Sequence, residues 1–182
     1  MSVGQQFENT LKDLYSAERQ FQRFLPNLQR SATDSRLKTV LQSKDLQVAT
    51  HVLRLEELAD EFGFKSGGKI CKSSQDLLEE TMDRLSEGNS DTNHDAAIIW
   101  CVRRHGNYEI CSCLSLIGWA RDLGRASATK DLEQTLSEED QSYEVVRAIP
   151  THAIAYRPVT REAGGRRSLW RFARRQSQRV SV

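Results

Sequence analysis

Hydrophobic side chains in residues 1–150 recur every three or four positions, in four long runs separated by polar or glycine-rich segments. This spacing places the apolar residues of each run on one face of an α-helix. The runs cover residues 7–30, 35–62, 95–123 and 128–149. No stretch of alternating polar and apolar residues bounded by turn signals predicts a β-strand in this region. The pattern therefore predicts an all-α protein with four long amphipathic helices.

The connection between the second and third runs is long and carries a helix of its own. Residues 63–72 read as a glycine-rich turn, and Ser73 with Asp76 three positions later resembles a capping box. That signal predicts a short helix over residues 75–87, followed by a polar loop over residues 88–93. Ferritin-like bundles have one such long crossover, whereas simple up-down-up-down bundles have none. We therefore predict a ferritin-like antiparallel four-helix bundle with a short crossover helix between its second and third helices.

An ionisable side chain interrupts the apolar stripe of each long helix. These residues are Glu18, His51, Glu109 and Glu139. Side by side, the helices would aim three carboxylates and one imidazole at a common interior. Buried carboxylates need a cation, a proton or a hydrogen-bond network, and bundle interiors are where two-metal carboxylate sites are built. The set predicts a site for iron or manganese, unless some of its members lie at the edge of their stripes and reach solvent.

Lys44 provides an alternative to the metal. It lies three positions after Leu41 and seven before His51, so its stem belongs to the core-facing stripe. Its ammonium could neutralise Glu18 or Glu109 directly, or it could extend along its stem to the surface. The spacing leaves both outcomes open.

Four stretches of the sequence resemble the YciE/YciF family of ferritin-like stress proteins. They are LKDLYSAERQF (11–21), HVLRLEELADEFGFKSGGKIC (51–71), NYEI (107–110) and LEQTLSEED (132–140). The resemblance covers residues 7–149 in the right order. It implies a stress-response protein with a four-helix bundle that forms a homo-oligomer, expected to be a dimer, and a two-metal carboxylate site between its helices.

The same resemblance assigns roles to individual residues. Glu18 matches the carboxylate of the family's DLY-x-AE motif, and Glu109 matches that of its YEI motif. Glu138 or Glu139 matches the acidic cluster of the last helix. His51 falls where the family has His or Gln ahead of its RLE motif. The resemblance therefore implies the same four metal ligands, with Glu138 as an alternative to Glu139.

Three departures from the family pattern fall at expected ligand positions. Lys44-Asp45-Leu46 stands where the family has His-Leu-Glu, Gly106 where its third helix has Glu, and Tyr143 where its fourth helix often has an acid. These departures predict a reduced or vestigial metal site. Bound iron would support Fe(II) oxidation or peroxide consumption. The alternative is a non-catalytic bundle in which ion pairs of Lys44 replace the metal.

The charge divides the chain into an acidic bundle over residues 1–150 and a basic tail over residues 151–182. The tail holds eight arginines against one acid, a net +7, so the bundle carries −6 within a total of +1. We expect the tail to be flexible and, with Trp170 and Phe172 between its arginines, able to bind nucleic acid. A membrane surface, docking on the bundle and a solubilising role are the alternatives. The candidate nucleic-acid contacts are Arg166, Arg167, Arg171, Arg174 and Arg175.

Two further features concern the cellular setting. No apolar window approaches the roughly 20 residues of a membrane span, and the first residues lack the features of a secretory signal, so we expect a cytoplasmic protein. Cys71, Cys101, Cys111 and Cys113 match no zinc-binding spacing. They are expected to be free, buried thiols in a reducing compartment.

Overall fold

The computed structural model describes residues 1–87 and 91–149, and every regular element in these ranges is an α-helix. The helices are α1 (Val3–Ser31), α2 (Ser35–Glu61), α3 (Lys72–Glu87), α4 (Asp91–Asp122) and α5 (Ala126–Arg147). The predicted all-α class is confirmed. None of the described helices is long and apolar enough to cross a membrane.

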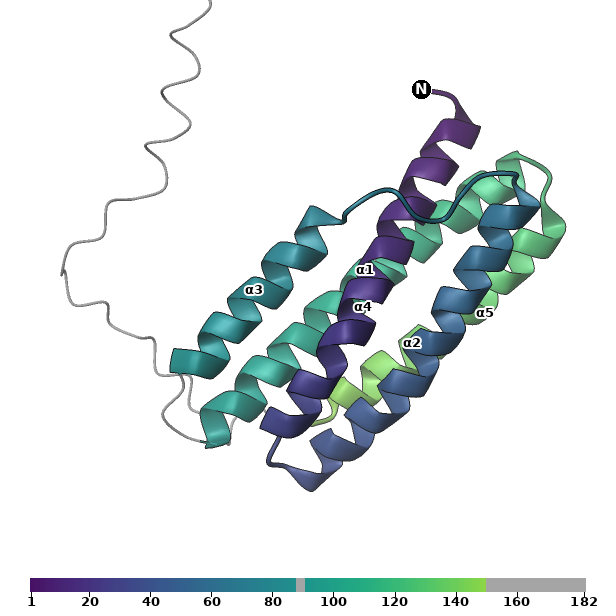
Figure 1. Cartoon of the computed structure of the whole chain (residues 1–182). Helices are drawn as coiled ribbons and strands as arrows, with labels where there is room; N and C mark the ends of the chain where they lie inside the picture. Colours follow the sequence, from purple (N-terminus) through teal and green to yellow (C-terminus); the bar gives the residue numbers. More distant parts are fainter. Residues whose placement is uncertain (88–90, 150–182) are drawn as a thin grey trace, which may run out of the picture.

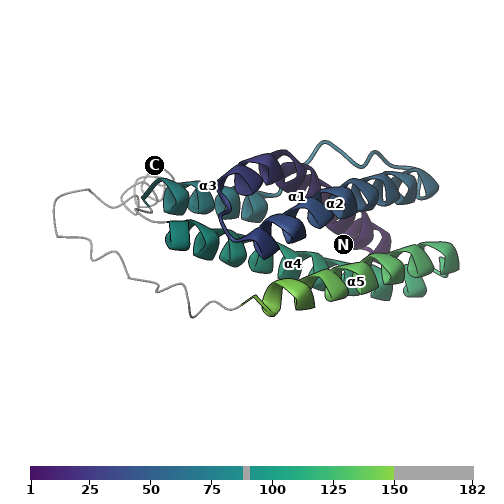
Figure 2. The ribbon, with the colours of Figure 1, turned by 90° about the horizontal axis from the view of Figure 1, so that it is seen from below.

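Four of the helices form the bundle, and α3 runs along its outside (Figure 1). α1 packs against α2 and α4, and α5 packs against the same two helices, so that every packed pair in the bundle is antiparallel. Figure 2 shows α1 and α2 in one layer and α4 and α5 in the other. α3 lies against α4 and α1 and returns the chain along the bundle, so that α2 and α4 point the same way. A single long crossover with this outcome is the ferritin-like arrangement, and it confirms the predicted topology.

The first two helices begin at side-chain caps. The Ser2 hydroxyl accepts a hydrogen bond from the Gln5 backbone N–H, while the Gln5 side chain accepts one from the Ser2 N–H. This capping box starts α1 four residues before the predicted first residue, Phe7. Asp34 caps α2, and its carboxylate accepts from the backbone N–H groups of Arg36 and Leu37. Side-chain oxygens therefore satisfy N–H groups that have no partner inside either helix.

The start of α3 differs from the prediction. The helix begins at Lys72, so Ser73 lies inside its first turn and the predicted capping box is wrong. Contacts with α1 account for the difference, because they hold the backbone of Cys71. Its N–H donates to the Ser16 hydroxyl at 2.9 Å, and its carbonyl accepts from the Gln20 amide at 3.1 Å. α4 likewise begins at Asp91, inside the segment predicted to be a loop.

A layer of polar side chains divides the core into two apolar clusters. One cluster fills the bundle around the second half of α1, and the other fills it around the first half. Phe21, Leu41 and Val102 belong to the first cluster, and Phe7, Leu55 and Leu116 to the second. Glu18 lies between Leu14 and Phe21, at the level where the two clusters meet. The apolar burial that stabilises the bundle therefore comes from both sides of a polar centre.

Asp95, near the start of α4, holds the turn between α1 and α2. Its carboxylate accepts from the Thr33 N–H at 2.7 Å, from the Thr33 hydroxyl at 2.6 Å and from the Asp34 N–H at 2.9 Å. We expect Asp95→Ala to lower the free energy of unfolding by ~1–3 kcal/mol, because three partly buried donors lose their acceptor. Urea denaturation measures the loss, with the exposed Asp140→Ala as control. Equal stability of the two variants would contradict this role of Asp95.

Candidate metal centre

Six ionisable side chains from four helices meet in the polar layer. They are Glu18 from α1, Lys44 and His51 from α2, His105 and Glu109 from α4, and Glu139 from α5, each at most 1% exposed. The structure therefore brings the four predicted ligands together with two further groups. Lys44 had been left open between core and surface, and its burial shows that the surface alternative is wrong. His105 was not among the predicted residues.

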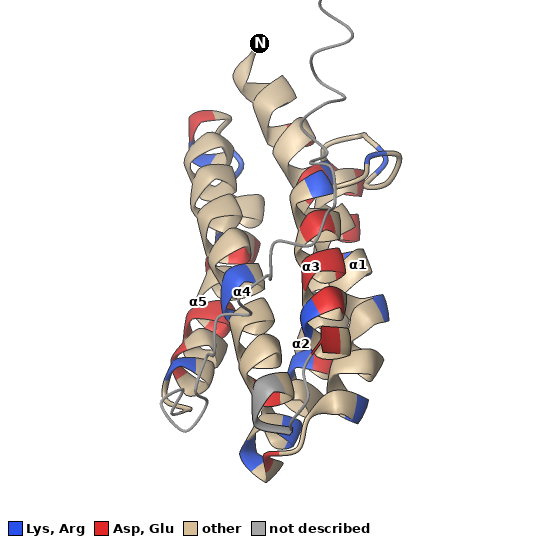
Figure 3. Cartoon of the chain, turned by 90° about the vertical axis from the view of Figure 1, so that its left-hand side faces the viewer, with Lys and Arg blue, Asp and Glu red and all other residues tan. Residues whose placement is uncertain are grey.

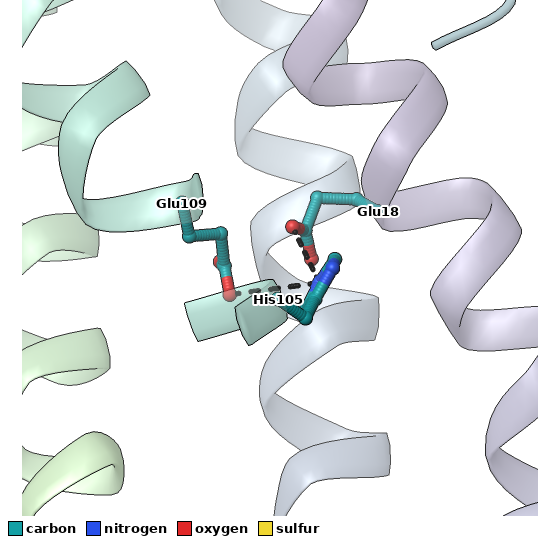
Figure 4. A group of neighbouring side chains, drawn as sticks. All are labelled: Glu18, His105 and Glu109. Carbon is teal, nitrogen blue, oxygen red and sulfur yellow. Dashed lines mark ion pairs between the residues drawn. The ribbon is translucent and has the colours of Figure 1, made fainter. Parts of the chain in front are cut away.

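Glu18, His105 and Glu109 form the first of two clusters in this layer (Figure 4). The Nε2 atom of His105 lies 3.2 Å from Oε1 of Glu18 and 3.8 Å from Oε2 of Glu109. One ligand atom from each residue lies within 4.8 Å of the other two. The His105 ring stacks on Phe21, with ring centroids 3.8 Å apart, and this contact holds the ring plane in position.

Glu18 is the least satisfied acid of the centre. It is fully buried, and neither of its carboxylate oxygens makes a hydrogen bond to any described residue. Its contact with His105 has the distance of an ion pair without hydrogen-bond geometry. Burial and the neighbouring Glu109 carboxylate raise the pKa of Glu18. This carboxylate therefore needs either a proton or a cation.

Lys44 neutralises the other side of the centre. Its Nζ atom contacts Oε2 of Glu139 directly and lies 3.5 Å from Oε2 of Glu109. Burial disfavours the ammonium form, but the two carboxylates outweigh it and raise the pKa of Lys44. Burial likewise disfavours the carboxylate form of Glu109, yet Lys44 and the His51 hydrogen bond hold its pKa well below the usual range. Lys44 and Glu109 are thus a buried pair of opposite charges.

His51 has both ring nitrogens turned to carboxylates. Its Nδ1 lies 2.8 Å from Oε1 of Glu109, and its Nε2 lies 3.0 Å from Oε2 of Glu138. Ionised carboxylates only accept hydrogen bonds, so this geometry favours a ring that carries a proton on both nitrogens. The hydrogen bond to Glu109 raises the pKa of His51 in spite of its burial. His51 therefore bridges the buried Glu109 and the partly exposed Glu138.

Glu138 forms the edge of the centre nearest to solvent. Its side chain is 34% exposed, and it accepts hydrogen bonds from Arg54 at 3.0 and 3.3 Å. These bonds and the one to His51 lower the pKa of Glu138 to about 2, against the effect of burial. The resemblance offered Glu138 or Glu139 as a ligand. In the structure the partly exposed Glu138 contacts His51 from the solvent side, whereas Glu139 is fully buried.

Gly106 makes room for Glu139. A Cβ atom on Gly106 would lie 2.6 Å from Oε1 of Glu139 and 3.2 Å from Cδ2 of Tyr143. With no side chain at position 106, the Glu139 carboxylate fills that space and reaches Lys44. Three departures from the family pattern, at positions 44, 106 and 143, are therefore neighbours in the structure.

Other motif residues hold the helices together. The Tyr15 hydroxyl donates to the Glu56 carboxylate at 2.7 Å, linking α1 to α2. Tyr15 belongs to the DLY motif and Glu56 to the RLE motif, so these two motif residues bind each other. Residues of these motifs thus contribute to helix packing as well as to the centre.

All four cysteines are free, as predicted, but they differ in exposure. Cys71, Cys101 and Cys113 are buried, and burial raises the pKa of Cys101 to about 12. Cys111 is exposed, so the prediction of burial is wrong for this residue. It lies two positions before Cys113 on α4, and residues at that spacing point in different directions on a helix.

The sequence does contain a signal for His105. It lies three positions after Val102 and four before Glu109, on the apolar stripe that identified Glu109. The resemblance drew attention instead to the neighbouring position 106. The helical spacing that places Glu109 on the buried face also places His105 there, so the sequence supports His105 as a candidate ligand.

Comparisons with known proteins agree with this fold. The DUF892 family model, described as a domain of unknown function, matches residues 2–156. Protein YciF of Escherichia coli (strain K12) is 29% identical over 134 residues, which cover 73% of this chain and 81% of YciF. The structure of YcfI from Rhodopseudomonas palustris superposes with a TM-score of 0.78 at 27% identity, covering 82% of this chain and 96% of YcfI. The crystal structure of the E. coli stress protein YciF gives a TM-score of 0.76 at 26% identity, covering 81% of this chain and 93% of the YciF chain.

Proposed function

This chain belongs to the DUF892 family, and we propose that the interior of its ferritin-like bundle binds one divalent transition-metal ion. The observation that carries the proposal is Glu18, a fully buried carboxylate with no hydrogen bond from the described residues. An uncompensated carboxylate costs several kcal/mol in such a setting. A metal ion between Glu18 and its neighbours would offset that cost.

Three residues have the positions and chemistry of ligands. Ligand atoms about 2 Å from a common ion lie roughly 3–4 Å from one another, and the Nε2 atom of His105 lies 3.2 and 3.8 Å from the Glu18 and Glu109 oxygens. Glu18 and Glu109 come from the predicted ligand set, and His105 is added to it. His51 donates to Glu109 and would orient this ligand from behind, as residues around metal sites commonly do. Glu139, the fourth predicted ligand, belongs to the other cluster of potential ligands and contacts Lys44.

Two carboxylates and one imidazole suit iron or manganese. Iron bound there would supply one-electron oxidation of Fe(II), with dioxygen or a peroxide as the electron acceptor, and the similar E. coli protein YciF is described as a stress protein. The residues of the chain hold and neutralise the ion, and the apolar clusters on both sides limit the access of water. We propose that the protein takes part in a stress response by binding this ion.

Metal titration tests the proposal. The full chain, stripped with chelator, is titrated with Mn(II) in air and with Fe(II) without oxygen, and bound metal is counted by mass spectrometry. We expect one ion per chain at saturation. Affinity should weaken as the pH falls, because Glu18 has a raised pKa and must lose its proton to bind metal. Binding far below one ion per chain would overturn the proposal.

A bundle without metal is the second candidate, and the Lys44 ion pairs favour it. Its function would be association, either with a second copy as a dimer or with nucleic acid. Exposed acids line α3 on the face shown in Figure 3, which disfavours nucleic acid on that face. Nucleic-acid binding is therefore proposed for the tail alone. Its candidate residues Arg166, Arg167, Arg171, Arg174 and Arg175 lie outside the described ranges.

A further inference from the structure

We infer that the ammonium of Lys44 takes the place of a second metal ion, so that the centre holds one ion where a two-metal centre holds two. The inference rests on the proposed function, because it specifies how many ions the same centre binds. Two clusters of potential ligands share Glu109. The first is Glu18, His105 and Glu109, and the second is His51, Glu109 and Glu139. In each cluster the ligand atoms lie within 4.8 Å of one another.

The second cluster already has a positive charge from Lys44 and most of its hydrogen bonds, with Oε1 of Glu139 left unpartnered among the described residues. Oε2 of Glu139 accepts from Lys44 and, at 3.3 Å, from Gln47. Oε2 of Glu109 accepts from Lys44, and Oε1 accepts from His51. Both nitrogens of His51 are engaged with carboxylates. A metal ion could bind this cluster only by displacing the ammonium and breaking the hydrogen bond between His51 and Glu109.

The first cluster lacks such compensation. Both oxygens of Glu18 and the Nε2 atom of His105 are without a hydrogen-bond partner among the described residues. In the second cluster, Oε1 of Glu139 is the one ligand atom without a partner among the described residues, whereas three polar atoms of the first cluster have none. This contrast places the single ion with Glu18 and not with Glu139.

The position of Lys44 is part of the packing. Its side chain is 1% exposed, and it lies on α2 between Leu41 and Val48, two buried residues of the apolar core. Its ammonium meets Glu139 because that acid occupies the space above Gly106. A route to solvent would take the charged group through packed apolar side chains, which is costly. Lys44 therefore stays in place, and like charges keep a second cation out.

A single ion changes what the centre can do. Two-metal centres act through ions about 3.5–4 Å apart that hold both reacting oxygens. With an ammonium in one position, only one redox-active ion remains, and one Fe(II) ion supplies one electron. The centre is thereby suited to holding an ion and not to chemistry that draws an electron from each of two metals.

Counting Mn(II) ions per chain tests the inference. The full-length wild type should bind one ion, with the electron paramagnetic resonance spectrum of an isolated Mn(II). Lys44→Met and Lys44→Gln should bind more, approaching two ions per chain, with the spectrum of a magnetically coupled pair. The glutamine variant keeps a donor for Glu139, so it serves if the methionine variant fails to fold. Lys38→Met, an exposed change on the same helix, should bind like the wild type.

The outcomes separate the inference from the proposed function. Two ions in the wild type would overturn the inference and leave the proposed function standing. One ion in the wild type and one in both Lys44 variants would also overturn it, since Lys44 would not be what limits binding. No ion in the wild type with binding in the Lys44 variants would overturn the proposed function and support exclusion by Lys44. Absence of metal from all of them would overturn both.

Discussion

Glu18→Gln should abolish stoichiometric metal binding and leave the metal-free protein at least as stable as the wild type. Glutamine keeps the shape of the side chain but removes the charge that a divalent ion needs. In the wild type, metal at about 100 times its dissociation constant should add roughly 2.7 kcal/mol of stability. For a chain of this size that corresponds to a rise of about 5–10 °C in the melting temperature. The variant should show no rise.

The sign of the metal-free effect follows from the raised pKa of Glu18. A carboxyl group whose pKa is higher in the folded state than its unfolded value near 4.5 binds more protons when folded. Stability from this group is therefore lost as the pH rises from the unfolded pKa through the folded one. Glu18→Gln removes that loss, so the difference in stability between variant and wild type should grow with pH in the presence of chelator.

Thermal melts with chelator and with Mn(II), together with metal analysis, measure these effects. Glu57→Gln is the matched control, because Glu57 is an exposed acid on α2. It should bind metal and melt like the wild type. Full metal binding by Glu18→Gln would show that Glu18 is not a ligand and that the ion binds at another place in the protein.

Lys44→Met should destabilise the metal-free protein by ~3–5 kcal/mol, the usual effect of removing one partner of a buried ion pair. The stem is replaced by a side chain of similar apolar character, but Glu109 and Glu139 lose their counter-charge. The melting temperature in chelator should fall by about 6–20 °C. Added Mn(II) should recover part of the loss, because it can neutralise the carboxylates that Lys44 leaves.

Two further variants isolate the ion pair. Lys38→Met changes an exposed lysine of the same helix and should have little effect on the melting temperature. Lys44→Met combined with Glu139→Gln should be more stable than the sum of the single changes predicts, because both members of the pair are gone. A metal-free Lys44→Met protein as stable as the wild type would contradict the role of Lys44 as counter-charge.

The polar layer is costly for folding, and that cost is itself informative. Apolar side chains would fill the same space between the two core clusters without desolvating charges. Sites where local stability rules are broken are where function is expected. In this chain the buried charges are concentrated in one layer, which holds both the unpaired Glu18 and the Lys44–Glu139 ion pair.

The sequence alone determined the fold class and the family. Periodicity predicted the bundle helices, and the glycine-rich segment after residue 62 predicted the long crossover. The resemblance of four short stretches to the YciE/YciF family is confirmed by the family and structural matches. Periodicity also predicted that Glu18, His51, Glu109 and Glu139 face inward, because a 3.6-residue repeat reports which face of a helix is buried. The prediction of a dimer stays a prediction.

Only the tertiary structure decided how the inward-facing groups pair. Periodicity reports direction around one helix, but it carries no information on which side chains of different helices meet. The ammonium of Lys44 reaches Glu139 because α2 and α5 are neighbours and because Gly106 on α4 leaves the space open. The start of α3 was likewise decided by contacts of Cys71 with α1. Local signals determined the helices, whereas contacts between residues distant in sequence determined the chemistry of the centre.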